Sequence, residues 1–216
     1  ETYDVVAADL DADGDADLAF AQADQGVLGN GVLVFMNNGD GTFGPERTIA
    51  GGNGPKGIVA ADLDGDGDLD LATSNNRSTS KTVTLLFNDG TGLFPTRVDV
   101  PTGTWQPYKL AAGDLTGDGR PELVVSFLNH NPAFGVLVND GSGGFGAPIP
   151  HTVGPVASQG LPGVAIGDID LDGDNDVLGS IDTSGTFSTI ALFKNDGLGN
   201  LTRQTPVSTG QSLGAI

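Results

Sequence analysis

The chain has 216 residues with 28 acidic and 9 basic side chains, which gives a formal net charge of −19 at pH 7. So acidic a chain is a poor partner for nucleic acid or for anionic membranes, whose phosphates require a basic surface. It contains no cysteine, which excludes disulfides and thiolate metal sites, and no apolar run long enough to insert in a membrane.

One acidic nine-residue pattern occurs four times, and its copies begin at Asp9, Asp62, Asp114 and Asp168. The leading aspartates are 53, 52 and 54 residues apart, and near-constant spacing is typical of a repeat protein. We therefore expect a single region over 1–216 with repeats at about 1–53, 54–106, 107–160 and 161–212. Residues 213–216 resemble the opening of a further strand.

Each repeat contains four short segments that read as β-strands. The first strands, rich in Ala, Gly and Val, are expected at 4–8, 57–61, 109–113 and 163–167. The second are expected at 17–21, 70–74, 122–127 and 176–181, directly after the acidic pattern. The third are expected at 31–36, 82–87, 134–138 and 188–193, and the fourth at 43–49, 94–100, 145–150 and 201–207.

A turn marker separates the third strand from the fourth in every repeat, and it begins at Asn37, Asn88, Asn139 and Asn195. Asn-Gly and Asp-Gly turns between apolar runs predict β-hairpins. Four short antiparallel strands in a repeat of this length are typical of a propeller blade. The sequence thus predicts an all-β propeller built from four-stranded blades.

The acidic loops carry oxygen donors at alternating positions, which is the chemistry that Ca²⁺ prefers. Positions one, three, five and nine offer side-chain oxygens, position seven offers a backbone carbonyl, and position six is a glycine that permits a sharp turn. An EF-hand is excluded because position twelve holds no glutamate in any copy. The predicted ligands of about four Ca²⁺ ions are Asp9, Asp11, Asp13, Asp15, Asp17, Asp62, Asp64, Asp66, Asp68, Asp70, Asp114, Thr116, Asp118, Arg120, Glu122, Asp168, Asp170, Asp172, Asp174 and Asp176. The alternative is a set of acidic loops that bind no metal.

The Asp-x-Asp-x-Asp-Gly-x-x-Asp loop, followed by Asn-Asp-Gly-x-Gly-x-Phe, resembles the FG-GAP/VCBS repeat. The resemblance implies the β-propeller of integrin α-subunits and of secreted bacterial and fungal proteins, including lectins, with Ca²⁺ held by these loops. The third copy departs from the pattern at Thr116 and Glu122, so we expect its site to be the weakest. Family propellers usually have seven blades and sometimes eight, which implies that this chain is a sector of a larger ring. A closed four-bladed ring or two chains that complete eight blades are the alternatives.

Strand parity places the acidic loops and the Asn-Asp-Gly turns on one face and the dissimilar loops on the other. Recognition usually resides in dissimilar loops on a rigid scaffold, so we expect ligand contacts there. The candidate ligand-binding residues are Trp105, Tyr108 and His130. The alternatives are that Trp105 packs between blades and that His130 is a solvated loop residue.

These features favour an extracellular or cell-surface Ca²⁺-binding module for recognition or adhesion, with a glycan or an extracellular protein as partner. Nucleophile-elbow, zinc-protease and phosphate-loop motifs are absent from the sequence, which argues against an enzyme. Two alternatives stay open. One is the scaffold or catalytic propeller of a secreted polysaccharide-degrading enzyme, and the other is a purely structural repeat of a large surface protein.

Overall fold

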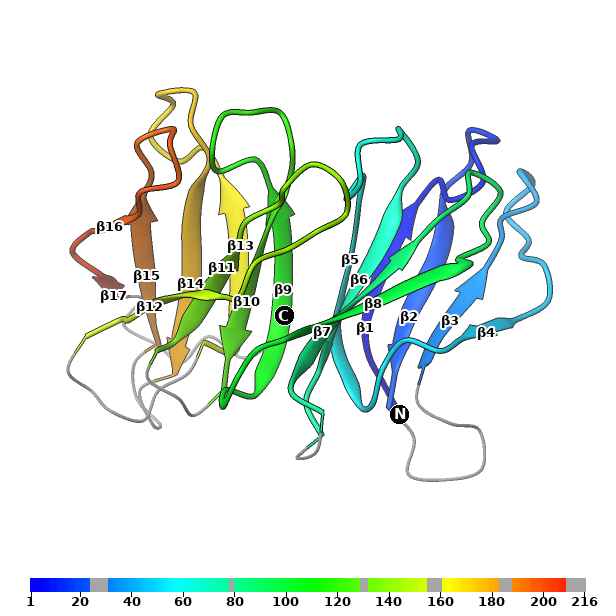
Figure 1. The fold of residues 1–216 in the computed structure, drawn as a ribbon, viewed down its shortest axis with the longest axis horizontal. Helices are drawn as coiled ribbons and strands as arrows, with labels where there is room; N and C mark the ends of the chain where they lie inside the picture. Colours follow the sequence, from blue (N-terminus) through cyan, green and yellow to red (C-terminus); the bar gives the residue numbers. More distant parts are fainter. Residues whose placement is uncertain (24–30, 78–79, 129–131, 155–160, 183–187, 209–216) are drawn as a thin grey trace. The chain divides into compact units, whose positions relative to one another are not determined.

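The computed structural model describes residues 1–23, 31–77, 80–128, 132–154, 161–182 and 188–208. Within this part of the chain every regular element is a β-strand (Figure 1), and it contains no helix that could cross a membrane. The strands fall into two compact units. The first contains Glu1–Pro107 with Asp140–Ala147, and the second contains Tyr108–Asn139 with Pro148–Ile216.

The first unit contains two antiparallel sheets, each with its strands in chain order. One sheet consists of β1 (Thr2–Ala8), β2 (Asp17–Gln22), β3 (Gly31–Phe35) and β4 (Arg47–Ile49). The other consists of β5 (Pro55–Ala61), β6 (Asp70–Asn75), β7 (Thr82–Phe87) and β8 (Thr96–Pro101). The edge strands β1 and β5 face each other, and the Ile58 amide donates to the Asp4 carboxylate at 3.3 Å.

The second unit repeats this arrangement. Its first sheet consists of β9 (Pro107–Gly113), β10 (Glu122–Phe127), β11 (Phe134–Leu137) and β12 (Ile149–His151). The last sheet consists of β13 (Gly163–Gly167), β14 (Asp176–Asp182), β15 (Ser188–Lys194) and an outer strand in two pieces, β16 (Thr202–Arg203) and β17 (Val207–Ser208). The prediction of an all-β chain with four four-stranded antiparallel blades is confirmed.

The outer strands are shorter than the sequence predicted. The predicted ranges 43–49, 94–100 and 145–150 begin two to four residues before β4, β8 and β12. Pro45, Pro95 and Pro148 stand before these strands, and proline has no amide to donate to a neighbouring strand. The same constraint separates β16 from β17, because Pro206 lies in the gap between them.

The apolar second residue anchors the first and third acidic loops to the sheet that follows. Leu10 packs with Leu71 and Leu86 of the next repeat, and Leu115 packs with core residues of the last sheet. Both leucines are almost fully buried, at 2% and 1% exposure. Burying a leucine side chain contributes roughly 1.5–3 kcal/mol, so the loops are held by the core and not by charge alone.

Candidate metal centres

All four acidic loops follow one hydrogen-bonding plan. The carboxylate at position one accepts the amide of the glycine at position six, which lies in the left-handed region that glycine favours. The pairs are Asp9 with Gly14, Asp62 with Gly67, Asp114 with Gly119 and Asp168 with Gly173, at 2.8–3.1 Å. The carboxylate at position five then accepts the amide of position seven at 2.9–3.0 Å. These bonds curl each loop around its own side-chain oxygens.

Position four also has positive φ in every loop. Gly65 and Gly117 fill it in the second and third copies, but Ala12 has a φ of 59° and Leu171 a φ of 62°. A residue with a side chain in this region costs roughly 1–2 kcal/mol. The two strained residues show that the loop plan is maintained even where the sequence opposes it.

The carboxylate at position nine is buried, and it joins the acidic loop to the turn after the third strand. Asp17 accepts the Leu10 amide at 2.8 Å and the Asn37 amide at 2.7 Å. Asp70 and Asp176 make the equivalent pairs of bonds, and Glu122 accepts the Leu115 amide. Burial raises the pKa of Asp70 to about 6, against the opposing effect of its two amide donors.

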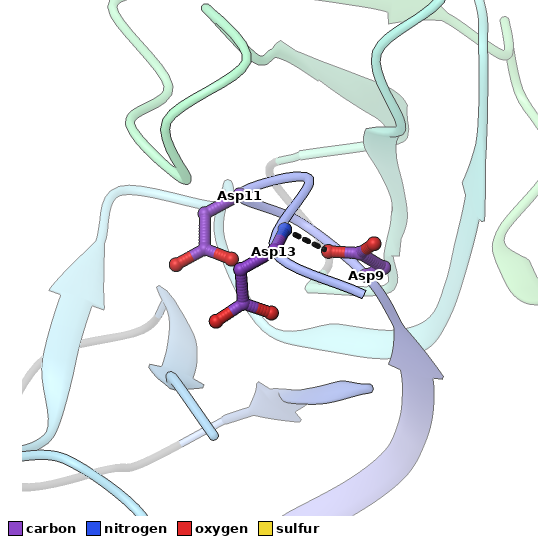
Figure 2. Close-up of side chains that lie close together, drawn as sticks. All are labelled: Asp9, Asp11 and Asp13. Atoms are coloured by element: carbon purple, nitrogen blue, oxygen red, sulfur yellow. Dashed lines mark hydrogen bonds between the residues drawn. The ribbon is translucent and has the colours of Figure 1, made fainter. Parts of the chain in front are cut away.

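Three of the loops gather carboxylate oxygens closely enough to share one cation. The clusters are Asp9, Asp11 and Asp13; Asp62, Asp64 and Asp66; and Asp168, Asp170 and Asp176, each with ligand atoms within 4.8 Å of one another. Figure 2 shows the first cluster, in which the Asp13 amide donates to Asp9 while the side chains of Asp11 and Asp13 lie next to each other.

The carboxylates at position three in the first two loops are destabilised in their charged form by burial and by the neighbouring negative charges. Asp11 Oδ1 is buried and has no hydrogen-bond partner. Burial, followed by the charges of Asp17 and Asp13, raises the pKa of Asp11 above its ordinary value. Burial and the nearby charge of Asp66 likewise raise the pKa of Asp64. A cation bound among these oxygens would remove both penalties, so the first two loops fit Ca²⁺.

The third loop lacks such a cluster among the described residues. Thr116 replaces the position-three carboxylate. The Arg120 amide and guanidinium both bond to Asp118, the latter at 2.5 Å, and they lower the pKa of Asp118. An internal cation therefore already pairs with one of the predicted ligands.

The fourth loop also has an internal cation, which the sequence analysis missed. The ammonium of Lys194 pairs with Asp170 and lies 2.9 Å from Asp172. Its hydrogen bonds to Asp170 and Asp172 raise the pKa of Lys194. A signal was present, because the residue before the turn asparagine is Met36, Phe87 or Val138 in the other repeats and a lysine only here.

Comparisons with known proteins agree with the repeat plan. The model of the "FG-GAP-like repeat" family matches residues 9–73 and 74–125, which together make up more than half of the chain. The chain belongs to the FG-GAP-like repeat family. No match was found among curated proteins. Among solved structures, a chain of the Photorhabdus luminescens Tc holotoxin pore is similar in fold, with a TM-score of 0.50 and 16% identity. The match covers 88% of this chain and 10% of that one.

The turn asparagine connects neighbouring FG-GAP-like repeats, a role that the sequence analysis did not assign. Asn88 donates to the Leu69 carbonyl of its own loop at 3.0 Å and to the Leu10 carbonyl of the preceding loop at 2.7 Å. Asn195 makes the same two kinds of bond, to the carbonyls of Asn175 and Leu115. The turn thus fixes the position of the preceding acidic loop as well as its own.

The turn glycines provide room for the side chain at position seven. A Cβ at Gly39 would lie 2.6 Å from the Asp15 carboxylate. The pairs Gly90 with Asp68 and Gly197 with Asp174 show the same approach, also at 2.6 Å. In these three FG-GAP-like repeats the side chain at position seven therefore lies against the turn. The role of its backbone carbonyl as a metal ligand stays a prediction.

The three candidate ligand-binding residues do not form a site that the structure describes. Trp105 belongs to the first unit and Tyr108 to the second, and both side chains are half-buried. His130 lies outside the described residues. Their shared role stays a prediction.

Proposed function

We propose that the chain is an extracellular Ca²⁺-binding propeller module of the FG-GAP-like repeat family that serves in recognition or adhesion. The observation that carries this proposal is the crowding of three carboxylates within 4.8 Å in three loops, with one Asp11 oxygen buried and unpaired. Ca²⁺ would neutralise the repulsion and complete the bonds of those oxygens.

The proposed ligands are the side-chain oxygens at positions one, three and five of each loop. In the cluster of the fourth loop, Asp176 at position nine joins Asp168 and Asp170. Clustered carboxylates suit Ca²⁺, which accepts a flexible coordination geometry, better than Mg²⁺, which demands near-ideal octahedral geometry. Each ion would fasten the loop between the first two strands of a blade and thereby stabilise the blade.

The extracellular location is part of the proposal. Modules exposed to millimolar Ca²⁺ need affinities of only about 10⁻⁴–10⁻³ M, which crowded but exposed loops can provide. The acidic surface and the absence of cysteine from the sequence agree with such a setting.

The partner is proposed to be a glycan or an extracellular protein, bound on the face opposite the acidic loops. Further blades, or a second chain, are proposed to cover the last sheet. Leu10, Leu63 and Leu115 are at most 2% exposed, whereas Ile169 at the same loop position is 42% exposed. An apolar residue that is buried in three repeats and exposed in the fourth supports a further repeat at that place.

A Ca²⁺ titration by calorimetry tests the proposal. We expect saturable binding of about four ions, and one fewer ion for Asp64→Asn, because the second loop then loses a central charged ligand. Asp99→Asn is the matched control, since Asp99 pairs with Arg97 outside the loops. Absence of saturable binding, or equal stoichiometry in both variants, would contradict the assignment.

A further inference from the structure

A small polar pocket lies in the first unit, on the side opposite its acidic loops. It is formed by the start of β1, the loop between β4 and β5, and the loop after β6. The volume is about 310 Å³, at the lower end of the range for small-molecule sites. Its lining includes Glu1, Tyr3, Gly54, Lys56, Asn76 and Arg77.

Backbone hydrogen bonds join the two loops that form the pocket. The Asn76 amide donates to the Gly54 carbonyl at 3.0 Å, and the Arg77 amide donates to the Asn53 carbonyl at 3.4 Å. Gly54 has a φ of 74°, and a Cβ there would lie 2.6 Å from the Arg77 side chain. The two loops are thus joined by backbone hydrogen bonds, and the arginine side chain packs on a glycine.

Besides Arg77, the pocket contains the ammonium group of Lys56, whose position is fixed by the ring of Tyr3. The Lys56 ammonium lies 2.9 Å from the centroid of the Tyr3 ring, a cation–π contact. The Tyr3 hydroxyl donates to the Glu1 carboxylate at 2.5 Å, and the Tyr3 side chain is 37% exposed. The pocket therefore offers a partly exposed ring next to a fixed ammonium group.

The pocket carries excess positive charge in a strongly acidic chain. Lys56 and Arg77 are two of only nine basic residues, and Glu1 is the single carboxylate among the lining residues. Burial and the neighbouring charge of Arg77 both lower the pKa of Lys56, while Glu1 opposes them. An incoming anion would balance the charge at this pocket.

We propose that this pocket binds a carboxylate-bearing sugar, with the carboxylate held between Arg77 and Lys56. A guanidinium can donate two parallel hydrogen bonds to one carboxylate, and an ammonium adds a point charge. The Asn76 amide can bond to sugar hydroxyls, and the Tyr3 ring offers apolar area to a sugar face. The inference rests on the proposed recognition face and adds a ligand class and a location to it.

The test compares the methyl glycoside of glucuronic acid (methyl glucuronide) with methyl glucoside by ligand-observed NMR and calorimetric titration. The two differ only at C6, which is a carboxylate in the first and a hydroxymethyl group in the second. We expect the glucuronide to bind at least about tenfold more tightly. Arg77→Gln and Lys56→Gln should each weaken its binding by about tenfold or more, because each removes a charge-assisted contact. Lys81→Gln, with the same charge change outside the pocket, should leave the affinity unchanged.

Several results would overturn the inference: no binding of either sugar, equal binding of both, or equal losses in all three variants. Tighter binding of an acetylated dipeptide carboxylate than of methyl glucuronide would assign the pocket to a peptide instead. The circular dichroism spectrum and the Ca²⁺-dependent melting of each variant serve as folding controls. They also separate a failure here from a failure of the metal proposal, since no pocket residue belongs to an acidic loop.

Discussion

Lys194 supplies a cation from within the chain to the fourth acidic loop, where it pairs with Asp170 and Asp172. Because Ca²⁺ must displace this ammonium group, we expect the fourth site to bind more weakly than the first two. Lys194→Gln should tighten Ca²⁺ binding at that site by several-fold to about tenfold, since affinity in such loops follows ligand charge.

A Ca²⁺ titration followed by NMR of the loop amides measures this effect site by site. Lys81→Gln, which makes the same charge change far from the acidic loops, is the control. Unchanged affinity of the fourth site in Lys194→Gln would show that the lysine does not compete with the metal. The third loop, where Arg120 pairs with Asp118, stays the site predicted to be weakest.

His151 should make the stability of the fold depend on pH, independently of the acidic loops. Its ring stacks on Phe134 with centroids 4.9 Å apart, and burial lowers the pKa of His151 below its ordinary value of about 6.5. Between that value and the folded-state pKa, the unfolded chain binds more protons, so stability falls as the pH falls through this window.

His151→Phe keeps a ring on Phe134 but removes the titration. We therefore expect the free energy of unfolding of the variant, relative to the parent chain, to rise as the pH is lowered from 7 to 5. Urea unfolding at several pH values, with saturating Ca²⁺, measures the difference. A constant difference over this range would show that His151 does not couple protonation to folding.

At the scale of residues, the gathering of carboxylates within a loop could be predicted from the sequence, because it depends only on their spacing along the chain. The carboxylates of the first two loops gather as the alternating positions predicted. Contacts between distant residues were not predictable in this way. Lys194 lies 24 residues from Asp170, and Asn88 lies 78 residues from Leu10. No local pattern records such a pairing, although comparing the same position across repeats would have marked the lysine.

At the scale of elements, the hairpin between the first two strands of each blade was predicted almost completely. Its second strands begin at Asp17, Asp70, Glu122 and Asp176, as expected. The outer strands were predicted too long, because an apolar residue such as Phe43 fits a strand pattern while the following Pro45 prevents pairing. Phe43 instead forms an isolated bridge with Asn37.

The inter-repeat bond of Asn88 should contribute measurably to stability. Asn88→Ala leaves the Leu10 carbonyl without this donor, and a buried unpaired polar group costs about 1–3 kcal/mol. We expect a loss of about 2 kcal/mol in the free energy of unfolding by urea. Asn37→Ala is the matched control, because Asn37 donates to Ala16 of its own loop and is more exposed. Equal losses in the two variants would argue against a special inter-repeat role.

At the scale of the whole molecule, stability depends on the buried central strands of the sheets, such as β6 and β10, and on acidic loops that carry most of the negative charge. The first acidic loop is tied to the core by its second residue, Leu10, and to the turn by its ninth, Asp17. A metal bound in the loop would therefore act on the whole blade, because the loop cannot loosen without disturbing both strands.

Thermal unfolding in millimolar Ca²⁺ and in excess EDTA tests this account most directly. A ligand that binds only the folded state at one hundred times its Kd adds about 2.7 kcal/mol per site, so the Tm should be at least about 5 °C higher in Ca²⁺. The same concentration of Mg²⁺, which controls for screening of the acidic surface, should give a smaller shift. Coincident melting curves in Ca²⁺ and EDTA would contradict the assignment of the acidic loops as structural calcium sites.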